Sequence, residues 1–405
     1  MNCGLLGRHL THSYSPRIHS QLGKYSYNIF EIAPDDLGSF LQEKEFDGIN
    51  VTIPYQKAVS PYCDTLAPQA TQLQAVNPIV KNADGRLIGH NTDYFGFAEM
   101  LKVSGLSVSG KKVLVLGSGG ASATVTAVLQ EKGTNVVVIS RNGENNYENL
   151  ELHSDASVIV NCTPVGMYPD NLISPVDLAL FPALEGVLDL IYNPARTALL
   201  LEAEKRGILT QNGLYMLVAQ AKESAEWFTG NKISDSKISE IYRELKANME
   251  NIVLIGMPGC GKSTVGALLA KMCDREFVDT DSLIVENAGK SIPEIFAAVG
   301  EEGFRKLETK VLAEVGKRSN LVIATGGGCI TKPENYPLLH QNSKIIWLRR
   351  DISILPTDGR PLSQTQRLEE MYNKRAPLYE AFADQIVDND TIPEYTVNTI
   401  LGGLK

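Results

Sequence analysis

The most specific chemical signal in the chain is a glycine-rich turn that carries a lysine and two hydroxyls. Residues 256–264 read Gly-Met-Pro-Gly-Cys-Gly-Lys-Ser-Thr and follow a run of apolar β-formers, Ile252 to Ile255. In this G-x-x-x-x-G-K-[ST] spacing, backbone N–H groups surround a phosphate, the lysine reaches the outer phosphates and the serine hydroxyl holds Mg²⁺. The sequence therefore predicts a strand, a phosphate-binding loop and a helix that bind ATP or GTP.

Two carboxylates and three separated arginines follow this loop. Asp279 and Asp281 form a D-x-D at the end of an expected strand, where side chains two residues apart share a face. Asp279 would reach hydrated Mg²⁺, and Asp281 would orient or deprotonate an acceptor hydroxyl. The arginines are Arg305, Arg360 and Arg375. Each alone is equally well an exposed helix residue, but beside a nucleotide they indicate recognition of an anion.

A second glycine turn lies in the first half of the chain. An expected strand over 111–116 leads into Gly-Ser-Gly-Gly-Ala-Ser at 117–122, a helix to about Lys132 and a second strand over 136–139. Such a βαβ unit places a pyrophosphate at a helix N-terminus. The third glycine position holds Ser122, so the motif alone is a weak indication of a dinucleotide.

The end of the second strand bears on which dinucleotide is bound. Arg141 stands there, and no carboxylate follows before Glu144. NAD sites place an acid at this point to bind the ribose 2′-hydroxyl, whereas a guanidinium suits the 2′-phosphate of NADP. The pattern favours NADP; the alternative is a solvated arginine after a strand.

Seven short segments rich in hydroxyl, amide and carboxylate side chains accompany this turn. They begin at His12, Gly48, Ala75, Gly89, Asn161, Asp189 and Asn212. Any one of them reads equally well as a helix cap or a turn. Their order and spacing together resemble shikimate dehydrogenase, from about Gly4 to Phe228.

The resemblance implies an enzyme that reduces 3-dehydroshikimate with NADPH. The residues that it implies for the polyol and carboxylate of the substrate are Ser13, Ser15, Thr52, Asn77, Asp93, Tyr192 and Gln220. Those that it implies for NADP are Gly117, Ser118, Gly119, Gly120, Ala121, Arg141, Leu190 and Gly213. A small polyhydroxy acid needs many fixed donors and acceptors, because an unpaired one in a buried site costs about 1–3 kcal/mol.

The chain departs from this family at its catalytic lysine. The family pattern N-V-T-x-P-x-K places a lysine beside the aspartate as its acid–base partner, but here that position holds Gln56 and Lys57 comes one residue late. In the first turn of a helix, a one-residue shift would rotate the side chain by about 100°. We expect Lys57 and Asp93 to be catalytic. The alternatives are that Asp93 works without an ammonium, or that the domain is catalytically weak.

The second half resembles shikimate kinase, from about Asn251 to the end of the chain. The resemblance implies that Asp281, Arg305, Gly327 and Arg375 hold shikimate. It implies ATP binding by Gly259, Cys260, Gly261, Lys262, Ser263, Thr264 and Arg360, catalysis by Asp281 and Lys262, and magnesium at Ser263 and Asp279. The segment around Arg360 resembles the mobile lid of the family and is short.

Composition narrows the class of protein. The chain has 405 residues, a net charge of −9 and no long basic run, so small molecules rather than nucleic acid or membrane are the expected partners. No apolar stretch approaches the length of a transmembrane helix, and the N-terminus lacks a signal-peptide pattern. Six scattered cysteines indicate reduced, mostly buried thiols in a cytoplasmic protein, and the histidine spacing does not suggest structural zinc. The oligomeric state stays open.

Alternating strand and helix patterns predict α/β architecture. We expect a substrate-binding α/β domain over 1–102 with a return helix at about 213–245, a Rossmann NADP domain over 103–212, and a P-loop kinase domain over 250–405. The last should have a parallel sheet, as nucleoside monophosphate kinases do. The two halves would catalyse successive steps, from 3-dehydroshikimate to shikimate and on to shikimate 3-phosphate. The alternatives are a weak, inactive or quinate-directed dehydrogenase half, and a kinase for another small acid such as gluconate.

Overall fold

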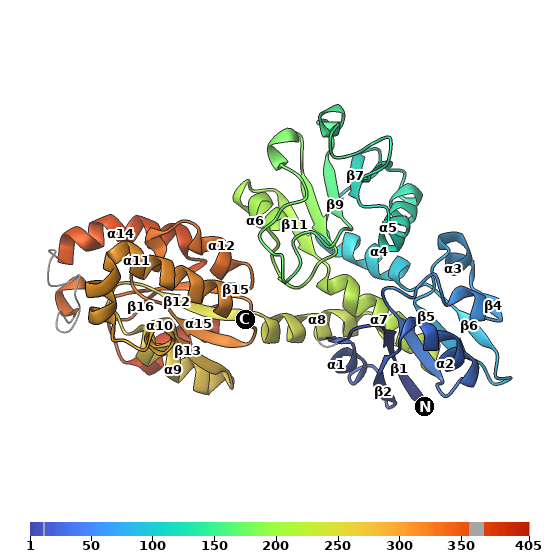
Figure 1. The fold of residues 1–405 in the computed structure, drawn as a ribbon, viewed down its shortest axis with the longest axis horizontal. Coiled ribbons are helices and arrows are strands. Elements are labelled where there is room, and N and C mark those ends of the chain that lie inside the picture. The colour runs from blue at the N-terminus through green and yellow to red at the C-terminus, as the bar shows by residue number, and fades with distance from the viewer. Residues whose placement is uncertain (11–12, 356–367, 405) are drawn as a thin grey trace. The chain divides into compact units, whose positions relative to one another are not determined.

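The computed structural model describes residues 1–10, 13–355 and 368–404. The chain divides into two compact units (Figure 1). The first comprises Met1–Tyr192 and Leu199–Leu245, and the second comprises Asn193–Ala198 and Lys246–Lys405. Among the described residues, no helix has the length and apolar character needed to cross a membrane.

The first sheet of the first unit mixes parallel and antiparallel strands in the order β2-β1-β3-β5-β6-β4. Its strands are β1 (Asn2–Gly7), β2 (Ser26–Glu31), β3 (Gly48–Val51), β4 (Thr65–Leu66), β5 (Pro78–Lys81) and β6 (Leu87–Gly89). β1 pairs in parallel with β2 and β3, while β5 pairs antiparallel with β3 and β6. Buried side chains from β1 and β3, among them Leu6 and Ile49, form the core of this sheet.

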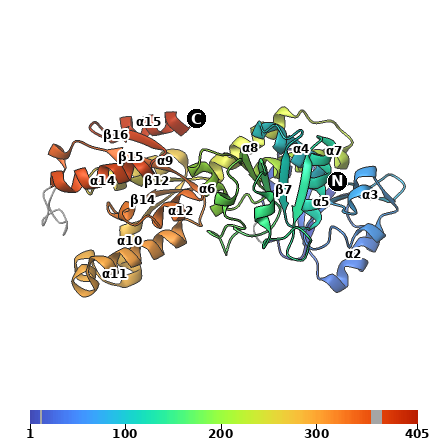
Figure 2. The ribbon, with the colours of Figure 1, turned by 90° about the horizontal axis from the view of Figure 1, so that it is seen from above.

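Helices cover this sheet and connect it to the next. They are α1 (Ser15–His19), η1 (Pro34–Asp36), α2 (Leu37–Glu43), η2 (Ser60–Tyr62), α3 (Pro68–Leu73), α4 (Asp93–Ser104) and α7 (Leu214–Thr229). α8 (Ser236–Met249) follows α7 in the chain, and its residues from Lys246 on belong to the second unit. α4 lies beside α7 and beside α5 (Gly120–Glu131) of the second sheet (Figure 2). The approach of α7 is close, since a Cβ on Gly96 of α4 would stand 2.9 Å from the carbonyl oxygen of Met216.

The second sheet of the first unit is entirely parallel, in the order β11-β10-β9-β7-β8. Its strands are β7 (Lys112–Leu116), β8 (Asn135–Ile139), β9 (Val158–Asn161), β10 (Gly186–Asp189) and β11 (Leu209–Asn212). The helices are α5 (Gly120–Glu131), η3 (Leu150–His153), η4 (Leu178–Leu180) and α6 (Ala198–Lys205), although α6 begins at the last residue of the second unit's short segment. The predicted strand, glycine turn, helix and second strand are all present.

The second unit is built on a five-stranded parallel sheet in the order β13-β14-β12-β15-β16. Its strands are β12 (Asn251–Ile255), β13 (Glu276–Asp279), β14 (Leu321–Ala324), β15 (Ser343–Arg349) and β16 (Gln385–Asp388). β12 is central and fully buried, as its run of apolar β-formers predicts. The phosphate-binding turn therefore leaves from the middle of the sheet.

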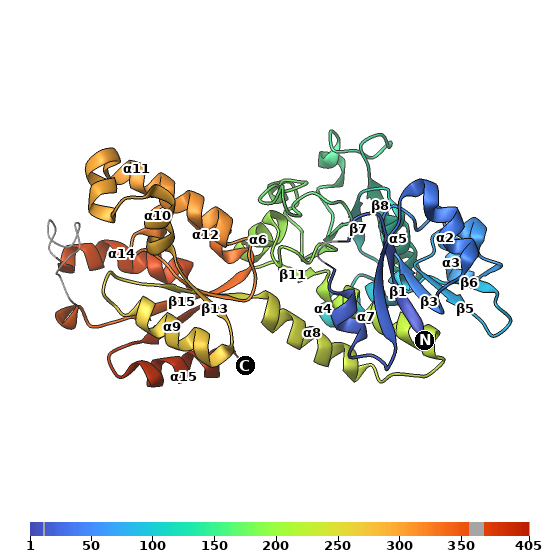
Figure 3. The same cartoon turned by 60° about the horizontal axis from the view of Figure 1, so that its bottom comes forward.

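Helices cover both faces of this sheet. They are α9 (Lys262–Cys273), α10 (Thr280–Ala288), α11 (Ile292–Val315), η5 (Cys329–Thr331), α12 (Asn335–His340), η6 (Ile352–Ile354), α14 (Leu368–Phe382) and α15 (Pro393–Leu404). α9 and α15 lie side by side on one face, and α11, α12 and α14 cover the other (Figure 3). α11 is interrupted at Gly300, whose φ of 68° is not helical.

Two expectations from the sequence need correction. Asp281 does not follow Asp279 along a strand, because β13 ends at Asp279 and Asp281 lies in the first turn of α10. Asp279 ends the strand because its carboxylate accepts hydrogen bonds from the N–H groups of Asp281 and Ser282 and so caps the helix. Of the six cysteines, only three are buried, Cys3, Cys260 and Cys329, rather than most of them.

Candidate active sites

Asp93 is the central acid of the first unit. It is the first residue of α4, and its side-chain oxygen Oδ2 accepts a 3.4 Å hydrogen bond from Nε2 of Gln56. Burial raises the pKa of Asp93 to about 6, and hydrogen bonds from Gln56 and Asn77 oppose that rise. The result is a carboxyl group that changes its charge close to neutral pH, as a proton-transferring group requires.

Gln56, and not Lys57, is the residue beside this acid. The segment after β3 is a series of turns rather than the first turn of a helix, and it buries Tyr55 while leaving Lys57 exposed. Among the described residues, no ion pair joins Lys57 to Asp93. The catalytic role assigned to Lys57 from the sequence stays a prediction, and it would require the side chain to move.

Several predicted substrate residues gather around Asp93. Thr52 directly follows β3 and Asn77 directly precedes β5, so both lie where these paired strands meet. The side-chain oxygen of Asn77 accepts a 2.7 Å hydrogen bond from the N–H of Thr92, the residue before Asp93. Gln220 of α7 packs against α4, since a Cβ on Gly96 would lie 3.0 Å from its Cβ. Its Nε2 donates to the carbonyl of Leu217.

The remaining predicted substrate residues form a second group. Ser15 is buried at the start of α1, and its N–H donates to the hydroxyl of Ser13 at 3.2 Å. Between them, the ring of Tyr14 packs edge-on against Tyr192, with ring centroids 6.2 Å apart. Burial raises the pKa of Tyr192, so its phenol stays a hydrogen-bond donor at neutral pH.

A buried polar network behind Asp93 was not identified from the sequence. Asn50 donates from Nδ2 to the hydroxyl of Ser224 at 2.7 Å and accepts from the hydroxyl of Tyr27 at 2.8 Å. The hydroxyls of Ser224 and Thr92 lie 3.0 Å apart. These groups come from four separate parts of the chain and fix the start of α4. No local motif announces Ser224, since only the packing of α7 on α4 brings it to the site.

The glycine turn after β7 adjoins the acid. Gly117 has a φ of 104°, a value that residues with a Cβ rarely adopt. Gly119 is the N-cap residue of α5. A Cβ on Gly120 would lie 3.6 Å from Oε1 of Gln56. The helix N-terminus that suits a pyrophosphate is therefore next to the side chain that contacts Asp93.

The other predicted dinucleotide residues lie at the ends of neighbouring strands. Leu190 follows β10 and Gly213 follows β11, and a Cβ on Gly213 would stand 2.0 Å from the carbonyl oxygen of Leu190. No side chain fits at that glycine. Arg141 lies two residues beyond β8 and is exposed. It lies near Tyr147: burial raises the pKa of that tyrosine, and the charge of Arg141 opposes the rise.

In the second unit, the phosphate-binding loop wraps around its own lysine. Lys262 is the first residue of α9, and its buried Nζ donates to the carbonyls of Gly256 and Met257 at 2.9 and 3.0 Å. Gly256 has a φ of 147°, and a Cβ there would come within 2.5 Å of the carbonyl of Leu348. The loop thus needs glycine to lie against β15, and the lysine is held inside it.

Ser263 and Asp279, the two residues expected to hold magnesium, lie next to each other. The Ser263 hydroxyl donates to Oδ2 of Asp279 at 2.7 Å. Within the described ranges, no three His, Cys, Asp or Glu side chains are grouped as metal ligands. The two oxygens fit Mg²⁺, which keeps several waters and commonly takes its other ligands from phosphates.

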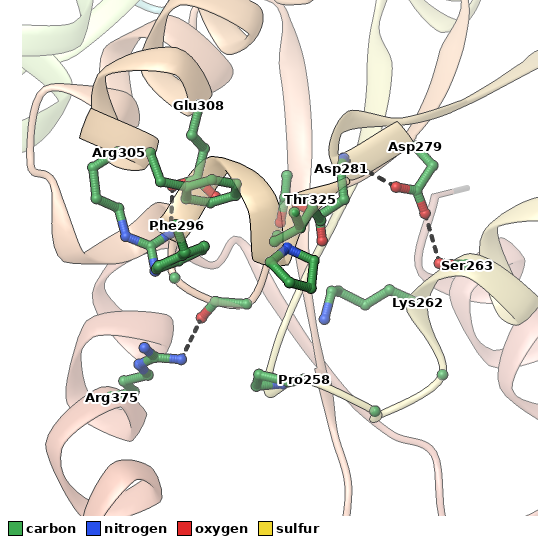
Figure 4. Close-up of a pocket in the computed structure, with 18 of the residues that line it drawn as sticks. Pro258, Lys262, Ser263, Asp279, Asp281, Phe296, Arg305, Glu308, Thr325 and Arg375 are labelled. Carbon is green, nitrogen blue, oxygen red and sulfur yellow. Dashed lines mark hydrogen bonds and ion pairs between the residues drawn. The ribbon is translucent and has the colours of Figure 1, made fainter. Parts of the chain in front are cut away.

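A cavity of about 470 Å³ joins this loop to the predicted acceptor site (Figure 4). Asp281 reaches it from α10, Arg305 and Glu308 from α11, and Gly326 to Gly328 from the loop after β14. One oxygen of Asp281, Oδ1, is buried without a hydrogen-bond partner. Burial raises the pKa of Asp281, and Asp279 adds to the rise, while Lys262 and Arg305 oppose it.

Two arginines form the far side of the cavity. Arg305 donates from Nη1 to Glu308 at 2.7 Å, and its Nε is buried without a partner. Arg375 of α14 donates to the carbonyl of Gly327 at 3.2 Å, and the hydroxyl of Tyr379 donates to the same oxygen. A Cβ on Gly328 would lie 2.1 Å from Arg305, so the glycine loop leaves room for that guanidinium. Arg360 and the lid around it lie outside the described residues.

Known proteins and family models match both halves of the chain. The shikimate dehydrogenase (NADP(+)) of Clostridium perfringens strain 13 is 34% identical over 265 residues, which are 60% of this chain and 97% of the relative. The chain belongs to the shikimate dehydrogenase family. The family model for the shikimate dehydrogenase substrate binding domain matches residues 5–79. The shikimate kinase family model matches residues 258–405, so the second half carries a shikimate kinase domain.

Solved structures support the dehydrogenase assignment. Shikimate dehydrogenase 1 from Peptoclostridium difficile is 37% identical, with a TM-score of 0.57, over 60% of this chain and 98% of that one. Shikimate 5-dehydrogenase from Thermus thermophilus, solved with NADP(H) and shikimate, is 33% identical, with a TM-score of 0.55 and coverage of 60% and 98%. At the level of these families, the predicted cofactors NADP, ATP and Mg²⁺ are confirmed.

Sequence reasoning overlooked several residues that line the kinase cavity, among them Glu308, Thr325 and Phe296. Glu308 is fully buried against Arg305, and burial raises its pKa to about 7 despite that arginine. Thr325 and Phe296 also face the cavity. Glu308 was open to prediction, because residues three apart on a helix are neighbours and the Arg305 to Glu308 spacing is visible in the sequence. The other two depend on how α11 and the loop after β14 approach each other.

Proposed function

We propose that the chain catalyses two successive reactions: reduction of 3-dehydroshikimate to shikimate with NADPH, and phosphorylation of shikimate to shikimate 3-phosphate with MgATP. The observation that carries the kinase half is the unpartnered oxygen of Asp281 in a cavity shared with the phosphate-binding loop. A buried carboxylate there is suited to accept the proton of an attacking hydroxyl.

The kinase residues divide by what they hold. Arg305, Arg375 and the glycine loop at Gly327 bind the carboxylate and hydroxyls of shikimate, because guanidinium forks match carboxylates. Asp281 orients the 3-hydroxyl and takes its proton. Lys262 leaves its loop carbonyls to neutralise charge on the transferring phosphoryl group, with Ser263 and Asp279 holding the magnesium that accompanies the nucleotide. Positioning and charge neutralisation supply most of the catalysis in such transfers.

The dehydrogenase half uses Asp93 next to the glycine turn. NADPH supplies a hydride to the C3 carbonyl carbon, and the protein must deliver a proton to the oxygen. Asp93 is the acid at hand, since Gln56 binds it but has no proton to give near neutral pH. Arg141 and the glycine turn at 117–121 hold NADP on this reading, and Asn77 and Thr52 fix the substrate hydroxyls.

Each half is tested on the full chain with shikimate as the common substrate. Shikimate with MgATP should yield ADP, and shikimate with NADP should yield NADPH. We expect ADP formation at an ordinary kinase rate, about 1–100 s⁻¹. Failure of ADP formation, with the protein folded, would remove the kinase half of the proposal. The same two assays with quinate and with gluconate in place of shikimate test the alternative substrates of the two halves.

A second reading of the dehydrogenase half is favoured by Gln56. A glutamine at the position of the acid–base lysine indicates a domain that is slow, inactive or directed at quinate. Under this reading, shikimate phosphorylation proceeds normally while NADPH turnover is weak with 3-dehydroshikimate.

The domain boundaries expected from the sequence and a cytoplasmic location are also proposals. The six cysteines, which form no disulfide, support the cytoplasmic location.

The pKa of Asp93, raised by burial to about 6, predicts opposite pH profiles for the two directions of this reaction. Reduction needs the protonated acid, so its initial rate should fall as pH rises through about 6. Oxidation of shikimate needs the carboxylate, so its rate should rise through the same range. Initial rates between pH 5 and 8 measure this, and the Asp93→Asn protein should have lost the activity. Profiles without an inflection in that range in either direction would contradict the role of Asp93.

Arg141 predicts a preference for NADPH over NADH. Arg141→Ala should raise the KM for NADPH about tenfold or more, the scale of a charge-assisted hydrogen bond, with little effect on NADH. The matched control is Lys132→Ala, which removes an exposed positive charge just beyond the far end of α5. If the wild type uses NADH as well as NADPH, Arg141 is an ordinary surface residue.

A further inference from the structure

Arg350 lines the kinase cavity, and neither the phosphate-binding motif nor the acceptor site accounts for it. It directly follows β15, at the carboxyl end of a strand next to the central β12. Its Nη1 lies 3.8 Å from the position that a Cβ on Gly261 would occupy. Gly261 is the last glycine of the phosphate-binding loop, so the guanidinium stands beside the backbone that would surround the phosphates.

The chain on both sides of Arg350 is fixed to other groups. Arg349 forms a two-point ion pair with Asp388 of β16, at 2.6 and 3.0 Å. The N–H of Asp351 donates to Oδ1 of Asp390 at 2.9 Å, and its carboxylate accepts from the N–H of Ser353. With its two neighbours held on the β16 side and in the following turn, Arg350 is the one of the three that faces the cavity.

The guanidinium of Arg350 lacks an anionic partner in the described part of the chain. Its Nε is buried without a hydrogen bond, and none of the described carboxylates forms an ion pair with it. The other cations of the cavity are already engaged: Lys262 with its loop carbonyls, Arg305 with Glu308, and Arg375 with the carbonyl of Gly327. A half-buried guanidinium without a counter-charge, in a cavity bounded by loop N–H groups, is arranged to receive an anion.

A second residue at this edge of the sheet also holds the loop in place. Asn389, which follows β16, donates from Nδ2 to the carbonyl of Cys260 at 2.7 Å and accepts from the hydroxyl of Thr396. A Cβ on Gly261 would stand 2.6 Å from that same Nδ2. Gly261 thus lies close to both Asn389 and Arg350, at the carboxyl ends of adjacent parallel strands, the edge at which open α/β sheets bind ligands.

We propose that Arg350 binds the phosphates of the nucleotide through its guanidinium. This inference rests on the proposed kinase function and adds a contact that the Gly-rich motif does not contain. The acceptor anion is the less favoured occupant, because Arg305, Arg375 and the glycine loop already surround that part of the cavity. Arg350 stands at the phosphate-binding loop itself.

The test measures binding directly, by titration calorimetry of the full chain with MgADP and with inorganic tripolyphosphate. Arg350→Ala should weaken both about tenfold or more, while Arg350→Lys, which keeps the charge without the fork, should lose less. The matched control is Arg318→Ala, which removes an exposed arginine that pairs with Glu276 at the amino end of β13 and does not line the cavity; this variant should bind both probes as the wild type does. Steady-state assays should show a raised KM for ATP and a KM for shikimate within about twofold of the wild type.

The outcomes separate this inference from the kinase proposal. If the wild type binds no MgADP, the kinase proposal itself fails. If the wild type binds MgADP and Arg350→Ala binds it equally well, the assignment of Arg350 is wrong. If Arg350→Ala weakens the binding of MgADP but not that of tripolyphosphate, the guanidinium contacts the base instead. If Arg350→Ala weakens shikimate binding and leaves MgADP binding unchanged, the guanidinium contacts the acceptor. Either result overturns the proposal. Shikimate binding by Arg350→Lys confirms that the cavity is folded.

Discussion

Replacing Asp281 by asparagine is expected to lower kcat for shikimate phosphorylation by about 10²–10⁴-fold, the range that general acid–base catalysis supplies. Asparagine keeps the size of the side chain and one acceptor oxygen, but it cannot accept a proton from the attacking hydroxyl. The substitution replaces one oxygen of a carboxylate whose Oδ1 is buried without a hydrogen-bond partner. ADP formation with saturating shikimate and MgATP measures the effect.

Two controls accompany this measurement. Asp274→Asn makes the same chemical change at an exposed position after α9, where φ is 53° and asparagine is well tolerated. It should leave ADP formation unchanged. NADPH turnover by the Asp281→Asn protein should equal that of the wild type, because the substitution lies in the kinase domain. A kcat within a few fold of the wild type in Asp281→Asn would refute the acceptor role of this carboxylate.

Replacing Gln56 by lysine is expected to raise the rate of 3-dehydroshikimate reduction by about 10²-fold or more. The side chain at this position already contacts Asp93, so an ammonium here would be placed to deliver the proton that glutamine lacks. The new positive charge would also lower the pKa of Asp93, because an opposite charge favours the carboxylate. The inflection in the pH profile near 6 should therefore move to lower pH.

Lys57→Ala is the matched comparison for this substitution. Lys57 is exposed, and its removal should change the reduction rate little if Gln56 occupies the catalytic position. A collapse of kcat in Lys57→Ala would show instead that Lys57 moves to Asp93 when substrate binds, as the sequence-based assignment requires. If the wild type is fast and neither variant changes the rate, another group supplies the proton.

The sequence predicted those parts of the sites that local chemistry determines. The strand, glycine turn and helix at 251–273 follow from apolar β-formers and from positive φ angles that only glycine adopts readily. The turn after β7 follows for the same reason. In both cases the residues that act together lie in one continuous segment of the chain.

Features that depend on long-range packing were missed or placed wrongly. The Asp281 carboxylate was assigned to a strand because period-two spacing describes strands, but the cap formed by Asp279 starts a helix one residue earlier. Ser224 reaches the Asp93 site only because α7 returns to pack on α4. Arg350 has no motif around it, and its place in the cavity follows from β15 lying beside β12. Such positions are set by register between strands rather than by the residues next to them.

The most direct test of a bifunctional chain follows both reactions at once in the unmodified protein. The protein is mixed with 3-dehydroshikimate, NADPH and MgATP, and NADPH loss, ADP release and shikimate 3-phosphate are measured over the same interval. We predict that all three changes occur and that ADP release begins only as shikimate forms, with reduction the slower step. If shikimate added directly also yields neither ADP nor shikimate 3-phosphate, the central claim of a functional kinase joined to a dehydrogenase is contradicted.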